Sequence, residues 1–104
     1  AGTWVEEGYE KDLTVMERAG MLDPEKYGFI IEPDGSFTER KNASWSDAGP
    51  KTYADFEGEW IALSDSLLEI TVDFWGGTMV YYLQIVFLEQ DLLKVRFDYR
   101  DGED

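Results

Sequence analysis

The amino-acid sequence predicts an all-β fold, a single small antiparallel up-and-down β-barrel of about eight strands spanning residues 1–104. Three observations predict it. Aromatic residues make up 15% of the chain, and aromatic side chains favour strands. Apolar and polar residues alternate with a period of two over several segments. Short turn sequences separate these segments, so neighbouring strands must run antiparallel.

The second half of the chain carries the clearest alternation. Over residues 67–72, apolar residues at every second position alternate with Glu69 and Thr71, which predicts a half-buried strand. Residues 93–99 alternate in the same way. The segment 79–88 is apolar at nearly every position. Its valine, isoleucine and aromatic content favours a strand covered on both faces, or one side of an interface, over a helix.

Short polar sequences mark the hairpin turns. Pro33-Asp34-Gly35-Ser36 separates two strands over residues 27–32 and 37–41, because proline and glycine supply the dihedral angles of a turn. Ser64-Asp65-Ser66 and Gln90-Asp91 separate strands in the same way later in the chain. We expect this meander to close, because closure removes the apolar edge that an open sheet would expose.

The first third of the chain is less regular. Residues 3–9 have the composition of a strand, and Asp23-Pro24-Glu25-Lys26 interrupts the chain. Over residues 12–20, alternating apolar positions favour a strand. A helix is the alternative there, because Leu13, Met16 and Gly20 would share one helical face.

Two polar segments complete the domain, which has no internal boundary. Residues 42–52 form one long loop rich in small and polar residues, and the acidic tail over 101–104 is expected to fray.

Charge and residue types exclude several functional classes. The net charge of -14 would repel phosphate backbones and anionic lipids, so we expect no nucleic-acid partner and no membrane insertion. The chain has no histidine and no cysteine, which excludes a serine–histidine couple, a thiol nucleophile and a zinc site. Carboxylates could bind calcium or hydrolyse a glycosidic bond, but no spacing in the sequence arranges them for either. We therefore expect no metal, no cofactor and no enzymatic activity.

Two glycine-x-tryptophan units, Gly2-Thr3-Trp4 and Gly58-Glu59-Trp60, begin the two halves of the chain. An apolar strand with the turn Asp34-Gly35 lies between them, and paired closing segments over 65–70 and 84–93 follow the second. This order resembles the short bacterial lipocalin-like domains, which are often exported proteins or lipoproteins of Bacteroidota. The resemblance covers nearly the whole chain. It implies a calycin-type barrel, an extracytoplasmic or secreted location, and ligand binding as a function of the family.

The long loop departs from the family pattern. In marine relatives, the loop after Arg-Lys-Asn reads Trp-Cys-Gly-Thr-Pro-Pro, whereas here Arg40-Lys41-Asn42 precedes a loop without cysteine. This departure and the absence of histidine leave open an engineered homologue with no biological function. The chain begins with Ala1-Gly2 rather than methionine, which is the start expected if a leader has been removed from an exported protein.

Large aromatic residues are the candidate ligand-binding residues: Trp4, Phe37, Trp45, Trp60, Trp75 and Tyr81. Tryptophans on strands either line a cavity or close the end of a barrel by packing across strands, and we favour closure for Trp4 and Trp60. Trp45 and Trp75 are predicted to lie in loops, where a contact at the rim or with a partner is the candidate role.

The side chains predicted to point inward are bulky: Trp4, Phe29, Ile31, Phe37, Trp60, Leu68, Ile70, Tyr81, Leu83, Ile85, Val95 and Phe97. Side chains of this size should fill most of an eight-stranded barrel. The sequence thus predicts a non-catalytic lipocalin-like barrel that binds at most a small hydrophobic ligand, weakly, at the barrel mouth. The alternative is a structural or protein-interaction domain with a filled barrel.

Overall fold

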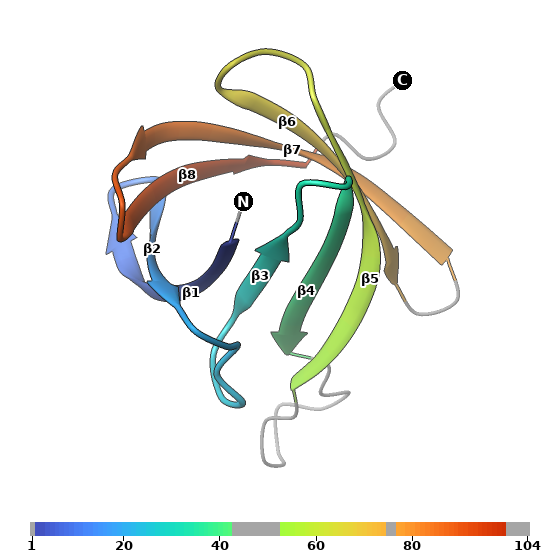
Figure 1. Cartoon of the computed structure of the whole chain (residues 1–104), viewed down its shortest axis with the longest axis horizontal. Coiled ribbons are helices and arrows are strands. Elements are labelled where there is room, and N and C mark those ends of the chain that lie inside the picture. Colours follow the sequence, from blue (N-terminus) through green and yellow to red (C-terminus); the bar gives the residue numbers. More distant parts are fainter. Residues whose placement is uncertain (1, 43–52, 75–76, 100–104) are drawn as a thin grey trace.

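A computed structural model describes residues 2–42, 53–74 and 77–99 of the chain (Figure 1). All regular structure in these ranges is β-strand: β1 (Gly2–Glu10), β2 (Leu13–Ala19), β3 (Gly28–Ile31), β4 (Ser36–Asn42), β5 (Tyr53–Ala62), β6 (Leu67–Phe74), β7 (Gly77–Leu88) and β8 (Leu92–Asp98). The strand favoured over residues 12–20 is confirmed as β2, and the helical alternative is wrong. No helix long and apolar enough to cross a membrane occurs among the described residues.

The eight strands close into a ring in the order β1-β2-β8-β7-β6-β5-β4-β3, and every neighbouring pair is antiparallel. This arrangement confirms the predicted all-β, antiparallel, up-and-down barrel. Asn42, predicted as the first residue of the long loop over 42–52, is the last residue of β4. The rest of that loop, both loop tryptophans, Trp45 and Trp75, and the tail over 101–104 lie outside the described residues.

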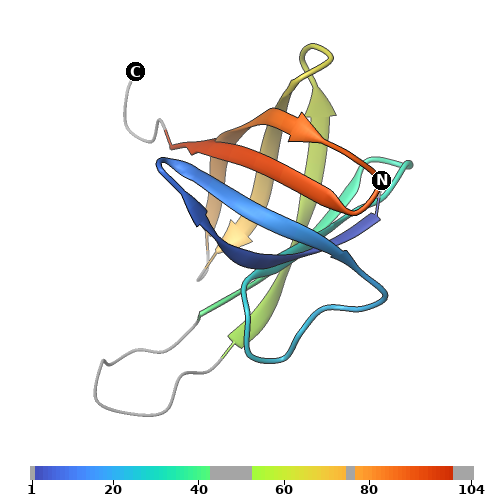
Figure 2. The same ribbon diagram turned by 90° about the vertical axis from the view of Figure 1, so that its left-hand side faces the viewer.

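One connection does not join neighbouring strands. β2 and β3 lie on opposite sides of β1, so residues 20–27 must pass β1 to connect them (Figure 2). Leu22 and Val5 are each only 8% exposed, and a β-carbon at Gly28 would lie 2.9 Å from Leu22 Cδ2. The Glu6 amide donates to the Tyr27 carbonyl at 2.8 Å. The connection is thus held against β1 and seals this part of the wall.

The interior is filled by apolar side chains, as predicted. Of the expected inward residues, nine are buried and the other three, Trp60, Ile85 and Phe97, pack against that buried cluster. The prediction missed three buried members, Met16, Val72 and Leu93. Burying these side chains supplies the main driving force for folding, at about 1.5–3 kcal/mol for each large apolar residue.

Strand β2 buries the face opposite to its most regular apolar alternation. Met16 is fully buried and Thr14 is 8% exposed, whereas Leu13 and Val15 are only partly buried. The alternation therefore identified the strand but not the side that faces the core.

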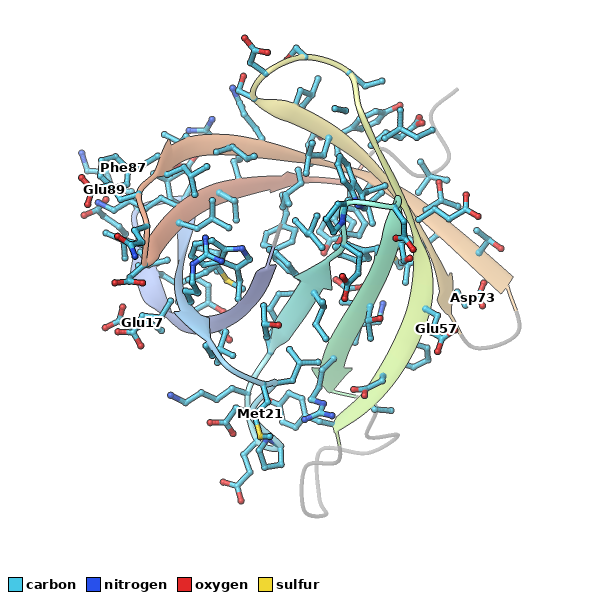
Figure 3. All side chains as sticks on the ribbon, viewed as in Figure 1. Glu17, Met21, Glu57, Asp73, Phe87 and Glu89 are labelled. Carbon is cyan, nitrogen blue, oxygen red and sulfur yellow. The ribbon has the colours of Figure 1, made fainter. Side chains whose placement is uncertain are left out.

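The outer surface is strongly acidic. Figure 3 shows Glu17, Glu57, Asp73 and Glu89 pointing away from the barrel wall, and all four are exposed. These residues come from different strands and turns, so negative charge is spread around the molecule.

Candidate ligand site at the barrel mouth

The two strand tryptophans both lie at the end of the barrel that carries the β3–β4 turn. Trp4 is 3% exposed, and the Arg18 guanidinium lies 4.4 Å from the centre of its ring. The Trp60 indole N–H donates to the Glu32 carbonyl at 2.7 Å, which ties β5 to the β3–β4 turn. Both contacts are those of tryptophans that close the end of a barrel by packing across strands.

Phe37 and Tyr81, the other two described candidates, are 1% and 0% exposed. Phe37 packs on Phe29 with 5.6 Å between ring centres. Tyr81 packs on Phe97 at 5.7 Å and on Tyr99 at 4.9 Å. Trp4, Phe37 and Tyr81 are therefore core residues, whereas the half-buried Trp60 packs against the core and lines a shallow depression beside the β3–β4 turn, so the structure does not gather the four around one cavity.

The opposite end of the barrel holds an open depression of about 290 Å³, which we call the aromatic mouth. It lies where the β1–β2 hairpin, the start of β5 and the end of β8 meet. Seven described residues line it: Glu6, Tyr9, Thr14, Tyr27, Tyr53, Phe97 and Tyr99. None of the residues proposed from the sequence as ligand-binding is among them, although Tyr81 lies directly behind Tyr99.

Local irregularities bring these side chains together. The β1–β2 pairing shifts register between Glu6 and Gly8, which is a β-bulge. Residues three apart on a regular strand face opposite sides, and a bulge removes that restriction, so Glu6 and Tyr9 both reach the mouth. Phe97 and Tyr99, two residues apart on β8 and just after it, share one face and stack with an interplanar angle of 9°.

A carboxylate is buried beneath the aromatic mouth. Glu39 on β4 is 1% exposed, and its Oε2 accepts hydrogen bonds from the Tyr27 hydroxyl at 2.5 Å and the Tyr81 hydroxyl at 2.9 Å. The Lys41 ammonium lies 3.4 Å from Oε1 and 5.1 Å from the centre of the Phe56 ring. Burying a carboxylate is costly unless it is paired and hydrogen-bonded; here Oε2 is hydrogen-bonded, whereas the buried Oε1 has the Lys41 charge nearby but no hydrogen-bond donor among the described residues.

Sequence reasoning missed Glu39, although a signal for it was present. Phe37 was predicted to point inward, and a period of two places residues 39 and 41 on the same side of the strand. An acidic residue at such a position indicates a buried polar contact rather than an exposed charge. The lining residues Tyr27, Tyr53 and Tyr99 carried no comparable signal, because their meeting depends on how distant strands pair.

The tyrosines around Glu39 titrate abnormally. Burial, reinforced by the Glu39 carboxylate, raises the pKa of Tyr27 and of Tyr81 well above the ordinary value of 10.0. Burial also raises the pKa of Tyr99 to about 12. All three hydroxyls therefore stay protonated in the folded protein at a pH where free tyrosine ionises.

We expect the barrel to lose stability above pH 10. Unfolded tyrosines release protons there while the folded ones do not, so the folded state binds more protons and the free energy of unfolding falls as pH rises. Tyr27 and Tyr81 each contribute a loss of about 1.4 kcal/mol per pH unit above the unfolded pKa, and Tyr99, which is 54% exposed, contributes less. Thermal unfolding from pH 8 to 11.5 checks this. Tyr81→Phe should show a shallower decline than wild type, and constant stability through pH 11 would contradict the assignment.

Among the described residues, no three acidic side chains gather closely enough to hold a metal ion. Comparisons of the chain with protein-family models, with curated proteins and with solved structures found no match.

Proposed function

We propose that this chain is a non-catalytic binding domain that takes a small, largely apolar ligand weakly at the aromatic mouth. The observation that carries the proposal is an aromatic-lined depression above a filled core. Ligand sites are mostly apolar and concave, with a few polar groups that fix orientation. Here Glu6 and Thr14 are the polar groups, and five aromatic rings supply the apolar surface.

The volume and openness of the site support weak rather than tight binding. The depression of about 290 Å³ lies at the small end of the range for ligand sites, roughly 300–1,000 Å³. The fully buried Phe29, Ile70 and Leu83 leave little room for a ligand to reach deeper. A ligand at the mouth would keep part of its surface in water and so gain less from burial.

The lack of histidine and cysteine supports a non-catalytic role, and the lipocalin-like sequence order supports ligand binding and an extracytoplasmic location. The non-catalytic role, the ligand binding and the extracytoplasmic location are therefore parts of the proposal.

The proposal is tested with N-phenyl-1-naphthylamine, a neutral dye that fluoresces in apolar surroundings. We expect saturable one-to-one binding with a Kd on the order of 10 μM or weaker, about -7 kcal/mol. Tyr99→Ala removes a wall of the mouth and should weaken binding several-fold. Leu63→Ala is the matched control, since Leu63 is 51% exposed against 54% for Tyr99 but lies in the β5–β6 hairpin at the other end.

Two results would contradict the proposal. Nanomolar binding would require a ligand deep in the barrel, which a filled core does not allow. The absence of saturable binding, or equal loss in the two variants, would remove the mouth as the site.

A second candidate function, a structural or interaction domain with a filled barrel, is favoured by apolar side chains at the opposite end. Leu63 in the β5–β6 hairpin is 51% exposed, and Val86 and Leu88 near the β7–β8 turn are 46% and 57% exposed. The Ile85 amide donates to the Ser66 carbonyl at 2.7 Å, which places the two hairpins side by side. A chain that binds no dye would be assigned to this second function.

A further inference from the structure

We propose that the aromatic mouth selects small ligands that carry a positively charged amine or ammonium group beside an apolar body. This inference rests on the proposed function, because it names the class of ligand for the same site. It follows from the walls of the mouth, from the charges nearest to it and from the charge of the whole chain.

The walls of the mouth are built mainly of aromatic rings. Tyr27 meets Phe97 edge to face with 5.8 Å between ring centres, and Phe97 stacks with Tyr99 at 6.1 Å. Tyr9 and Tyr53 add two further rings. The face of an aromatic ring carries partial negative charge, so cations near such faces are attracted while anions are repelled. Clusters of rings around a depression therefore favour ammonium groups over carboxylates.

The formal charge in the lining is negative. Glu6 is the one carboxylate among the seven described lining residues, and none of the seven is lysine or arginine. Glu6 and Tyr9 both line the mouth, and the hydrogen bond between their side chains raises the pKa of Tyr9. No described lysine or arginine forms an ion pair with Glu6. Its charge is thus available to a cationic ligand.

The other acids nearby are already paired. Glu10 accepts from the Lys94 ammonium at 3.0 Å, and Asp12 accepts from the Arg96 guanidinium at 2.9 Å. Glu39, beneath the mouth, has Lys41 at 3.4 Å. Lys94 and Arg96 of β8 are thus held by acids other than Glu6, and Lys11 in the β1–β2 turn is exposed and does not line the mouth. Among the described lining residues, Glu6 therefore gives the mouth a negative formal charge.

The charge of the whole chain acts in the same direction. With 23 acidic and nine basic residues, the protein raises the local concentration of cations and lowers that of anions. Salt screens this long-range contribution at distances beyond the Debye length of about 8–10 Å, whereas direct contact with the rings and with Glu6 is less affected. A preference that persists at moderate salt would thus belong to the mouth.

Three probes of nearly equal size and shape separate charge from apolar contact: phenethylamine, 2-phenylethanol and phenylacetate. Binding to the folded chain is followed by NMR titration in 150 mM salt, which locates the shifted resonances. We expect the amine to bind about tenfold tighter than the neutral alcohol, a difference of about 1.4 kcal/mol. Phenylacetate should bind most weakly, and the shifts should centre on Tyr27, Phe97 and Tyr99.

The variant Glu6→Gln removes the charge but keeps the size of the side chain and an acceptor for Tyr9. It should reduce the affinity for phenethylamine several-fold and leave that for 2-phenylethanol unchanged. Glu17→Gln is the matched control, because it removes one charge from an exposed position on β2 outside the mouth (Figure 3). It should leave both affinities unchanged.

The outcomes separate the two proposals. Equal affinity for amine and alcohol at the mouth would overturn the selection for cations and leave the binding site in place. Shifts from phenethylamine spread over the acidic surface, without saturation, would also overturn it. If none of the probes shifts resonances at the mouth, the proposed function itself fails. If a variant fails to fold, the comparison of the three probes on the wild-type chain still tests the selection for cations.

Discussion

Replacing Gly58 with alanine is expected to destabilise the barrel by about 3–5 kcal/mol, because a side chain there overlaps the backbone of the next strand. A β-carbon at Gly58 would lie 2.0 Å from the Thr71 carbonyl oxygen and 2.6 Å from Val72 Cα. Both atoms belong to the backbone of β6, which pairs with β5 at this point. No rotamer change can relieve the overlap, so the strands must separate. The melting temperature should fall by roughly 20 °C.

Gly8→Ala is the matched control, since Gly8 also lies in a strand but a β-carbon there would meet nothing within 4 Å. We expect its stability to stay within about 1 kcal/mol of wild type, with a gain if the lost freedom of the unfolded chain dominates. Equal stability of the two alanine variants would show that β5 and β6 are not as close at Gly58 as the structure describes.

The hairpin that contains Gly58 shows why the fold could be predicted from the sequence. The hairpin of β5 and β6 was predicted from the alternation over residues 67–72 and from the turn Ser64-Asp65-Ser66, which are local features. Turn chemistry and a period of two depend on neighbours in sequence, so a single chain reveals them. The same glycine was noted as part of a glycine-x-tryptophan unit, but the close approach of β6 that requires it was not visible there.

The features that sequence reasoning missed depend on distant pairing. Nothing local in residues 20–27 indicates that this connection passes β1. Turn residues predict hairpins between sequence neighbours, and this connection is not a hairpin.

The candidate site was the least predictable part. Four of the proposed ligand residues were chosen for size, but large aromatics also make the best core, and Trp4, Phe37, Trp60 and Tyr81 are used there. The mouth instead uses Glu6 and Tyr9, brought together by a β-bulge, and Tyr27 and Tyr99, which come from opposite ends of the chain. Such a grouping requires the register of the strands, and composition does not supply it.

Glu39 joins the core to the mouth, and its removal is the most informative test of how the mouth is built. Its Oε2 holds the hydroxyls of Tyr27, which lines the mouth, and of Tyr81, which lies in the core. These partners are 12 and 42 residues away in sequence. The carboxylate therefore fixes the relative positions of β3, β4 and β7 beneath the aromatic surface.

Glu39→Ala is expected to cost about 3–5 kcal/mol, because it leaves two tyrosine hydroxyls and the Lys41 ammonium without their acceptor and opens a cavity. Glu39→Gln keeps the volume and one acceptor oxygen, and should lose less. Glu57→Ala is the control, since Glu57 is exposed on the outer face of β5 and its loss should change stability by no more than about 0.5 kcal/mol (Figure 3). Chemical denaturation measures all three variants.

A double-mutant cycle then separates the hydrogen bonds from simple loss of volume. Tyr81→Phe alone should cost about 1 kcal/mol, because the carboxylate loses one donor. In the Glu39→Ala background the same substitution should cost much less or restore stability, since the hydroxyl there has lost the carboxylate that accepts its hydrogen bond. Additive costs would show that the Tyr81 hydroxyl does not depend on Glu39. The carboxylate would then not be what holds the floor of the mouth together.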